Sequence, residues 1–153
     1  MPDAAQRIRA FLLVTLTVGM ICRSTELLLI GQRETGQQQI PLVLRGLGVA
    51  AAAWHAAAPR PTTVRGLQVM MVLFVVSGVV GVVLHYRGNV EFELEMYPAM
   101  GGLELVQKTL TGATPVLAPG SMTLLGLIGL THTYQHPSLG RGAPAARSKE
   151  GDA

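Results

Sequence analysis

Four long apolar stretches constrain the fold of this chain more than any other feature of its sequence. A helix needs about 20 consecutive, mostly apolar residues to cross the hydrocarbon core of a bilayer. Stretches of this kind lie at about 8–31, 40–58, 66–86 and 115–134. Because a spanning segment must satisfy its backbone hydrogen bonds internally, the sequence predicts an all-α fold, a transmembrane four-helix bundle in contact with the lipid bilayer.

The composition agrees with a membrane protein and excludes several other classes. The chain has 153 residues, of which 49% are apolar and only 14% charged, against roughly 25% charged in a soluble domain. The net charge of +3 is scattered and forms no basic stripe interleaved with aromatic residues, so nucleic acid is excluded as a partner. Cys22 is the single cysteine, which excludes an internal disulfide and a cysteine zinc site.

The distribution of Lys and Arg predicts the orientation. Seven of them lie in the N-terminal flank, the second loop and the tail, and three lie in the first and third loops. Positive residues favour the cytoplasmic side, so residues 1–136 are expected to form a multi-pass domain with both termini cytoplasmic. The tail, 137–153, is small and polar and is expected to be disordered. A preference for Arg over Lys, with abundant Ala and Gly, favours a bacterial inner-membrane protein.

The third loop, 87–114, carries most of the acidic side chains. Residues 90–96 alternate between apolar and acidic side chains, so an extended segment would place Glu91, Glu93 and Glu95 on one face. By the predicted orientation this acidic face is extracytoplasmic. There it can form a lid over a polar patch or a contact surface for another protein.

A short helix is predicted later in the same loop, over 102–111. Leu103, Val106 and Leu110 share one stripe of this helix, and Gly112 follows it as a stop signal. A short helix with an apolar stripe is expected to lie flat on the extracytoplasmic membrane surface.

Three ionisable residues fall within the predicted spans, namely Arg23, Glu26 and Arg45. In an antiparallel hairpin Glu26 and Arg45 lie at similar depth, and Arg23 lies about one turn deeper on nearly the same face as Glu26. Buried charges are costly unless they are paired or hydrated. Three alternatives stay open: the arginines extend to the headgroups, the triad is a buried structural network, or it binds a ligand or a proton.

Two histidines lie near the predicted cytoplasmic ends of different spans, His55 in the second and His132 in the fourth. Two imidazoles at similar depth on different helices are what a b-type haem requires. His136 follows His132 by four residues, so the two can share a helical face and bind a metal. The alternative is that these histidines, like Trp54, anchor the helices at the interface.

A second metal hypothesis concerns the other end of the third span. His85 precedes the three carboxylates, and Met96 and Met100 follow. Imidazole and thioether ligands together suit copper. Haem b and copper are thus the two cofactors that the sequence suggests, and it identifies neither.

Helix packing in lipid relies on small residues, because lipid tails are as apolar as the helices. Candidates for such contacts are Gly46, Gly48, Ala50, Ala52, Ser77, Gly78, Gly81, Gly126 and Gly129.

Pro119 and Gly120 interrupt the fourth apolar stretch. Proline removes a backbone donor and disrupts a helix interior. Either the helix is broken there, as in some transport sites, or it starts late, near Ser121.

Three stretches, "HYRGNVEFELEMYP", "LAPGSM" and "THTYQHP", resemble parts of small uncharacterised bacterial four-helix integral membrane proteins, over roughly residues 26–137. The resemblance implies a recurrent bacterial membrane protein and brings no activity, cofactor or assigned site.

No complete catalytic motif accompanies these features, since the sequence has no P-loop, GxGxxG or HExxH. We therefore expect a non-enzymatic accessory or assembly subunit, which contacts other membrane proteins or a second copy of itself through the acidic loop. The alternative is a membrane redox protein with haem b, or a transport protein for a small ligand bound at the intramembrane triad.

Overall fold

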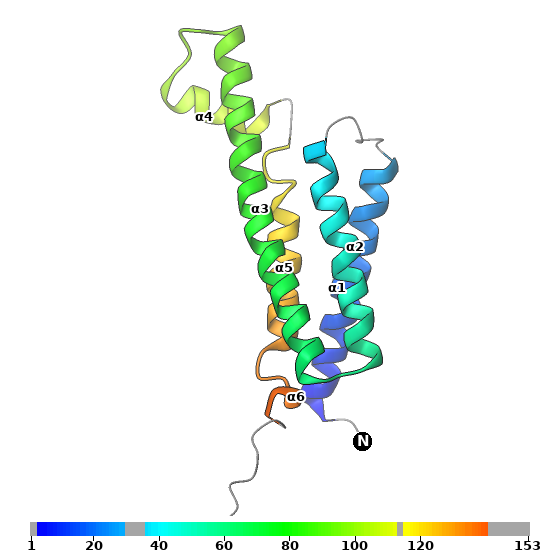
Figure 1. Cartoon of the computed structure of the whole chain (residues 1–153). Coiled ribbons are helices and arrows are strands. Elements are labelled where there is room, and N and C mark those ends of the chain that lie inside the picture. Colours follow the sequence, from blue (N-terminus) through cyan, green and yellow to red (C-terminus); the bar gives the residue numbers. More distant parts are fainter. Residues whose placement is uncertain (1–2, 30–35, 113–114, 141–153) are drawn as a thin grey trace, which may run out of the picture.

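The computed structural model describes residues 3–29, 36–112 and 115–140, and all the regular secondary structure in these ranges is helical (Figure 1). The helices are α1 (Ala4–Leu29), α2 (Gly36–Ala57), α3 (Pro61–Met96), α4 (Gly102–Thr111), α5 (Gly120–Thr133) and α6 (Pro137–Gly140). The prediction of an all-α fold is confirmed.

Within the described residues, three helices are long and apolar enough to cross a membrane: α1, the part of α2 from Gln39 to Ala57, and α3. The chain is therefore a small multi-pass membrane protein. The fourth predicted span is only partly helical, because α5 has 14 residues. It rises about 21 Å, less than the roughly 30 Å of a hydrocarbon core.

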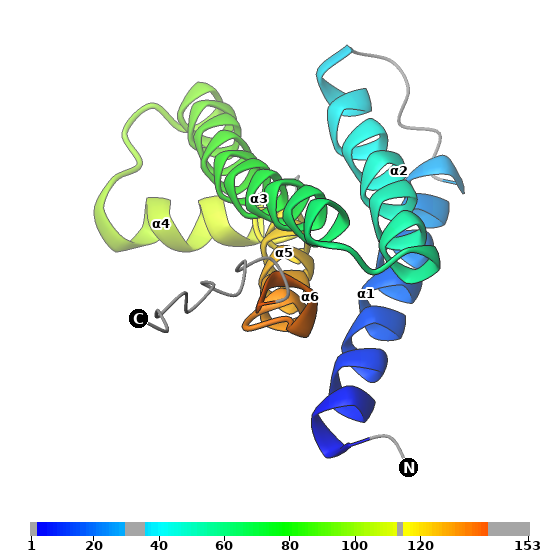
Figure 2. The same ribbon diagram turned by 60° about the horizontal axis from the view of Figure 1, so that its bottom comes forward.

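Four helices pack side by side: α1 contacts α2 and α5, and α3 contacts the same two helices (Figures 1 and 2). Where they meet, apolar side chains from all four form one buried cluster, consisting of Leu16, Met20, Ala52, Leu67, Met71, Phe74, Met122 and Leu125. Many large apolar side chains on the outer faces of α1 and α3 are exposed instead. These faces suit contact with lipid.

The start of α5 agrees with the late-start alternative. A turn over 116–119 precedes the helix, which begins at Gly120. Two glycines of α3 accommodate this region. A Cβ at Gly78 would lie 2.6 Å from the backbone nitrogen of Thr123, and a Cβ at Gly81 would lie 2.6 Å from Pro119 Cβ.

Further along the same contact, a Cβ at Gly126 would lie 2.7 Å from the carbonyl oxygen of Met71. The predicted role of small residues is confirmed where α3 meets α5, and also at Gly48, where a Cβ would lie 2.6 Å from a Phe74 ring carbon. Gly46 is different, because nothing lies within 4 Å of a Cβ placed there.

The expectation of an extended segment over 90–96 is wrong. This segment forms the last turns of α3, which continues to Met96. The segment contains no proline or glycine, and Glu, Leu and Met are good helix formers, so its alternating pattern does not interrupt the helix. In a helix Glu91 and Glu95 share a face and Glu93 points elsewhere.

The short helix predicted over 102–111 is confirmed as α4, with Gly112 directly after it. The first residues of the predicted tail, 137–140, form α6, whose Ser138 is buried. Residues 141–153 lie outside the described residues. In Figure 1, α4 lies at the end of the molecule opposite to α6 and the start of α1.

We predict that Gly78→Ala destabilises the protein by about 1–3 kcal/mol, because an added methyl group must displace the backbone of α5. Gly66→Ala, in the same helix but with nothing within 4 Å of its Cβ, is the control. It should be neutral or stabilising by up to about 1 kcal/mol. Thermal unfolding in detergent measures both, and equal melting temperatures for the two variants would contradict the packing argument.

Candidate functional site

Three histidines converge at the end of the molecule where α1 begins and α6 lies. His55 comes from the last turn of α2, His132 from the last turn of α5, and His136 from the segment just after α5. Each offers a ring nitrogen, and these three atoms lie within 4.8 Å of one another. His55 and His132 are buried and His136 is half-buried. We call these three residues the histidine cluster.

The ring of His132 is oriented by the N-terminal helix. Its Nδ1 lies 2.9 Å from the carbonyl oxygen of Arg9, so this nitrogen carries the proton and donates. The buried Nε2 has no hydrogen-bond partner among the described residues. With Nδ1 protonated, Nε2 is the nitrogen through which His132 can bind a metal.

The ring of His55 is oriented by the start of α3. Its Nδ1 lies 3.3 Å from the hydroxyl oxygen of Thr63. That hydroxyl lies 2.8 Å from the carbonyl oxygen of Ala58 and 3.0 Å from that of Arg60, so its single proton is donated to one of them. The oxygen can then only accept from His55, which leaves the Nε2 lone pair of His55 available.

His136 reaches the cluster through a turn rather than along a continuing helix. The helix ends at Thr133, and Gln135 has a φ of 46°, the left-handed conformation that reverses the chain. His132 and His136 therefore do lie together, with ring centroids 5.8 Å apart, although they do not share a helical face.

The environment of His136 favours an uncharged ring. Burial, followed by the neighbouring His132 and Arg9, holds the pKa of His136 below its usual value. Its Nδ1 accepts a hydrogen bond from the backbone nitrogen of Ser138 at 3.2 Å. Coordination through Nε2 would require His136 to give up this bond and change tautomer.

Three imidazole nitrogens are a ligand set for a borderline transition metal such as Zn²⁺ or Cu²⁺. Around a tetrahedral zinc ion with bonds of about 2.0 Å, ligand nitrogens lie roughly 3.3 Å apart. The ring nitrogens of the cluster lie within 4.8 Å of one another, a separation of the same order. The hydrogen bonds from the outer nitrogens of His55 and His132 are of the kind that orient metal-binding histidines.

A haem between His55 and His132 fits this geometry less well than a single ion. A bis-histidine haem requires the two rings on opposite sides of a flat macrocycle. Here the ring of His136 lies close to both, with its centroid 5.0 Å from that of His55 and 5.8 Å from that of His132, and the centroids of His55 and His132 are themselves 5.2 Å apart.

Two of the copper ligands suggested at the other end of α3 do not come together. His85 and Met96 lie on one continuous helix, about 16 Å apart along its axis, so they cannot bind the same ion. Nor are Glu91, Glu93 and Glu95 a single acidic face. Glu93 is buried, whereas the other two are exposed.

Arg23, Glu26 and Arg45 lie together in the structure, and the two arginines make different contacts. Arg23 forms an ion pair with Glu26, and both side chains are partly exposed. Arg45 is buried, and its Nη1 donates to the carbonyl oxygen of Arg23 at 3.4 Å. The side chain of Arg45 therefore lies inside the bundle.

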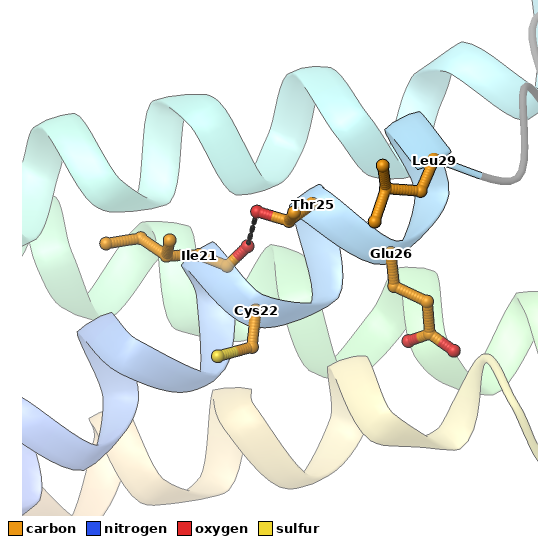
Figure 3. Close-up of a pocket in the computed structure, with 5 residues that line it drawn as sticks. All are labelled: Ile21, Cys22, Thr25, Glu26 and Leu29. Atoms are coloured by element: carbon orange, nitrogen blue, oxygen red, sulfur yellow. Dashed lines mark hydrogen bonds between the residues drawn. The ribbon is translucent and has the colours of Figure 1, made fainter.

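Figure 3 shows a shallow hollow on α1 beside this triad. It is lined by residues of that helix alone, namely Ile21, Cys22, Thr25, Glu26 and Leu29. The Thr25 hydroxyl already donates to the carbonyl oxygen of Ile21. A hollow with one helix as its wall does not define a binding site.

Sequence reasoning missed the residues that orient the histidines: Arg9, Thr63 and Ser138. Thr63 was accessible from the sequence, because it follows "PRP" as the third residue of a helix, where its hydroxyl accepts from the backbone nitrogen of Arg60. Arg9 and Ser138 act through backbone atoms, which leave no signal in the side-chain pattern.

Comparison with protein-family models, curated proteins and solved structures finds no match to this chain. The resemblance to a bacterial four-helix family is thus supported only in part: the chain is a small all-helical membrane protein.

We predict that His55 and His132 carry their proton on Nδ1 and that His136 carries it on Nε2 near neutral pH, because of their partners. Imidazole ¹⁵N chemical shifts in detergent micelles distinguish the two tautomers. His85, outside the cluster, is the reference. A spectrum with His55 and His132 protonated on Nε2 would refute the assignment.

Proposed function

We propose that this membrane protein binds one divalent transition-metal ion, of the zinc or copper class, through His55, His132 and His136. The observation that carries the proposal is the convergence of three ring nitrogens within 4.8 Å. His55 lies far in sequence from His132 and His136, and two of the rings are already oriented by outer hydrogen bonds. The absence of a carboxylate or thiolate from this ligand set favours a borderline metal over Ca²⁺ or Mg²⁺.

Such an ion would link the end of α2, the end of α5 and the turn after it. Three protein ligands leave a fourth coordination position for water or an external ligand. The half-buried position of His136 supports access from the end where α1 begins. By the distribution of Lys and Arg we assign this end to the cytoplasm, which gives an ion held at the cytoplasmic surface of the bundle.

We also propose that residues 115–134 form a fourth pass. Arg9 of α1 donates to the carbonyl oxygen of Gln135 at 3.1 Å, so the chain after α5 returns to the end where it began. The turn over 116–119 packs on the glycines of α3. Non-helical backbone is tolerated at membrane depth when it is buried in protein.

The metal proposal is tested by titrating Co²⁺, as a coloured substitute for Zn²⁺, into protein purified in detergent with a tag free of histidine. We expect one equivalent to give visible ligand-field bands that Zn²⁺ removes. Each of His55→Ala, His132→Ala and His136→Ala should weaken binding by about 100-fold, because each removes a ligand.

His85→Ala is the matched control, since it removes a histidine outside the cluster and should leave the affinity unchanged. Wild-type protein that gives no bands, or variants that bind as tightly as wild type, would refute the site.

A second candidate function is supported by the length of α3. Its 36 residues span about 54 Å, well beyond a hydrocarbon core of about 30 Å. If the first turns of α3 lie at one membrane surface, its last turns project from the other, together with α4. Glu91 and Glu95 are exposed one turn apart there, which suits contact with a basic extramembrane surface of a partner membrane protein, as expected of an accessory subunit.

We predict that Glu91→Gln combined with Glu95→Gln removes a partner that co-purifies with the wild-type protein at low salt. Glu104→Gln, an exposed acidic residue on α4, is the control and should retain it. Glu93 is left unchanged because it is buried. A partner that remains bound to the double variant would show that these carboxylates do not form the contact.

A further inference from the structure

Arg45 is a buried cation near the end of the bundle opposite to the histidine cluster. Its exposed fraction is 4%. It lies about 9 Å along the helix axis from Gln39, where the apolar part of α2 begins. Its guanidinium is therefore inside the protein, within the apolar part of α2.

The hydrogen-bonding capacity of Arg45 is mostly unused. A guanidinium has five N–H donors. Among the described residues Arg45 makes a single long hydrogen bond, from Nη1 to the carbonyl oxygen of Arg23. Its Nε is buried without a partner among the described residues, and so is the Nε of Arg23.

The local charge is also unbalanced. Glu26 pairs with Arg23, and among the described residues no carboxylate forms an ion pair with Arg45. An arginine does not lose its proton in proteins. A buried charge without a counter-charge is strongly destabilising. We therefore expect an anion from outside the described residues to neutralise Arg45.

We propose that Arg45, with the Nε–H of Arg23, binds a phosphate group. The planar fork of arginine matches phosphate oxygens with two parallel charge-assisted hydrogen bonds. The group can belong to the headgroup of an anionic phospholipid or to free phosphate. Exposed apolar side chains on either side of Arg23 in α1, Ile21 and Leu28 among them, are compatible with a lipid whose chains lie along that helix.

The test measures the melting temperature of the full chain in detergent with two probes, short-chain phosphatidylglycerol and inorganic phosphate. We expect phosphatidylglycerol to raise the melting temperature of the wild type by about 3 °C or more. Arg45→Gln should abolish the shift. Arg65→Gln removes an exposed cation at the other end of the bundle and should retain it.

Two further variants keep the test informative if Arg45→Gln does not fold. Arg45→Lys keeps the charge without the fork and should weaken binding about tenfold. Glu26→Gln releases the charge of Arg23 and should strengthen it. A purely structural Arg45 would give neither change.

A shift with phosphatidylglycerol alone identifies a lipid as the source, and a shift with inorganic phosphate as well identifies free phosphate. Both support the site if they depend on Arg45. Absence of any shift in the wild type, or an equal shift in Arg45→Gln and wild type, would overturn the proposal. The outcome is independent of metal binding at the histidine cluster.

Discussion

The contact between α3 and α5 is the interaction on which the rest of the structure depends. α5 is too short to hold its place in a membrane by its own length, so its position is set by packing on its neighbours. Glycines at 78, 81 and 126 let its backbone approach that of α3 so closely that a methyl group would clash. Because such contacts do not allow α5 to slide along α3, they fix where α5 ends. That end carries His132, and the turn beyond it carries His136.

The two ends of the bundle differ in chemistry because of how their polar groups are satisfied. At the end with the histidine cluster, the imidazoles of His55 and His132 are oriented by a threonine hydroxyl and a backbone carbonyl. This leaves the lone pairs of their Nε2 atoms available. At the other end the guanidinium of Arg45 is buried, and the Nε–H groups of Arg23 and Arg45 have no partner among the described residues. One end therefore suits a cation and the other an anion.

Much of this arrangement could be predicted from the sequence, where the physical signal is local. The length of the apolar stretches predicted the helices, and Pro119 predicted the late start of α5. An apolar stripe followed by a glycine predicted α4. The alternation at 90–96 was misleading because period 2 over seven residues carries no information on a partner strand. Glutamates and leucines there continue α3 instead, which separates Glu93 from Glu91 and Glu95.

The site was harder to predict than the helices. His132 and His136 were expected to meet by helical spacing, and they meet through a reversal at Gln135. The pairing of Arg23 with Glu26 follows from their spacing on one helix. The burial of Arg45 depends on tertiary packing that no spacing encodes, and the same holds for backbone partners such as the Arg9 carbonyl.

The hydrogen bond between His132 and Arg9 joins residues 123 positions apart. When the first three helices have been synthesised, the Arg9 carbonyl is present, but His132, whose ring this carbonyl orients, has not yet been made. The cluster is thus complete only after α5 has been placed and the chain has turned back at Gln135. Its assembly therefore follows the packing of α5, so an intact cluster marks a chain in which α1, α2 and α5 have reached their positions.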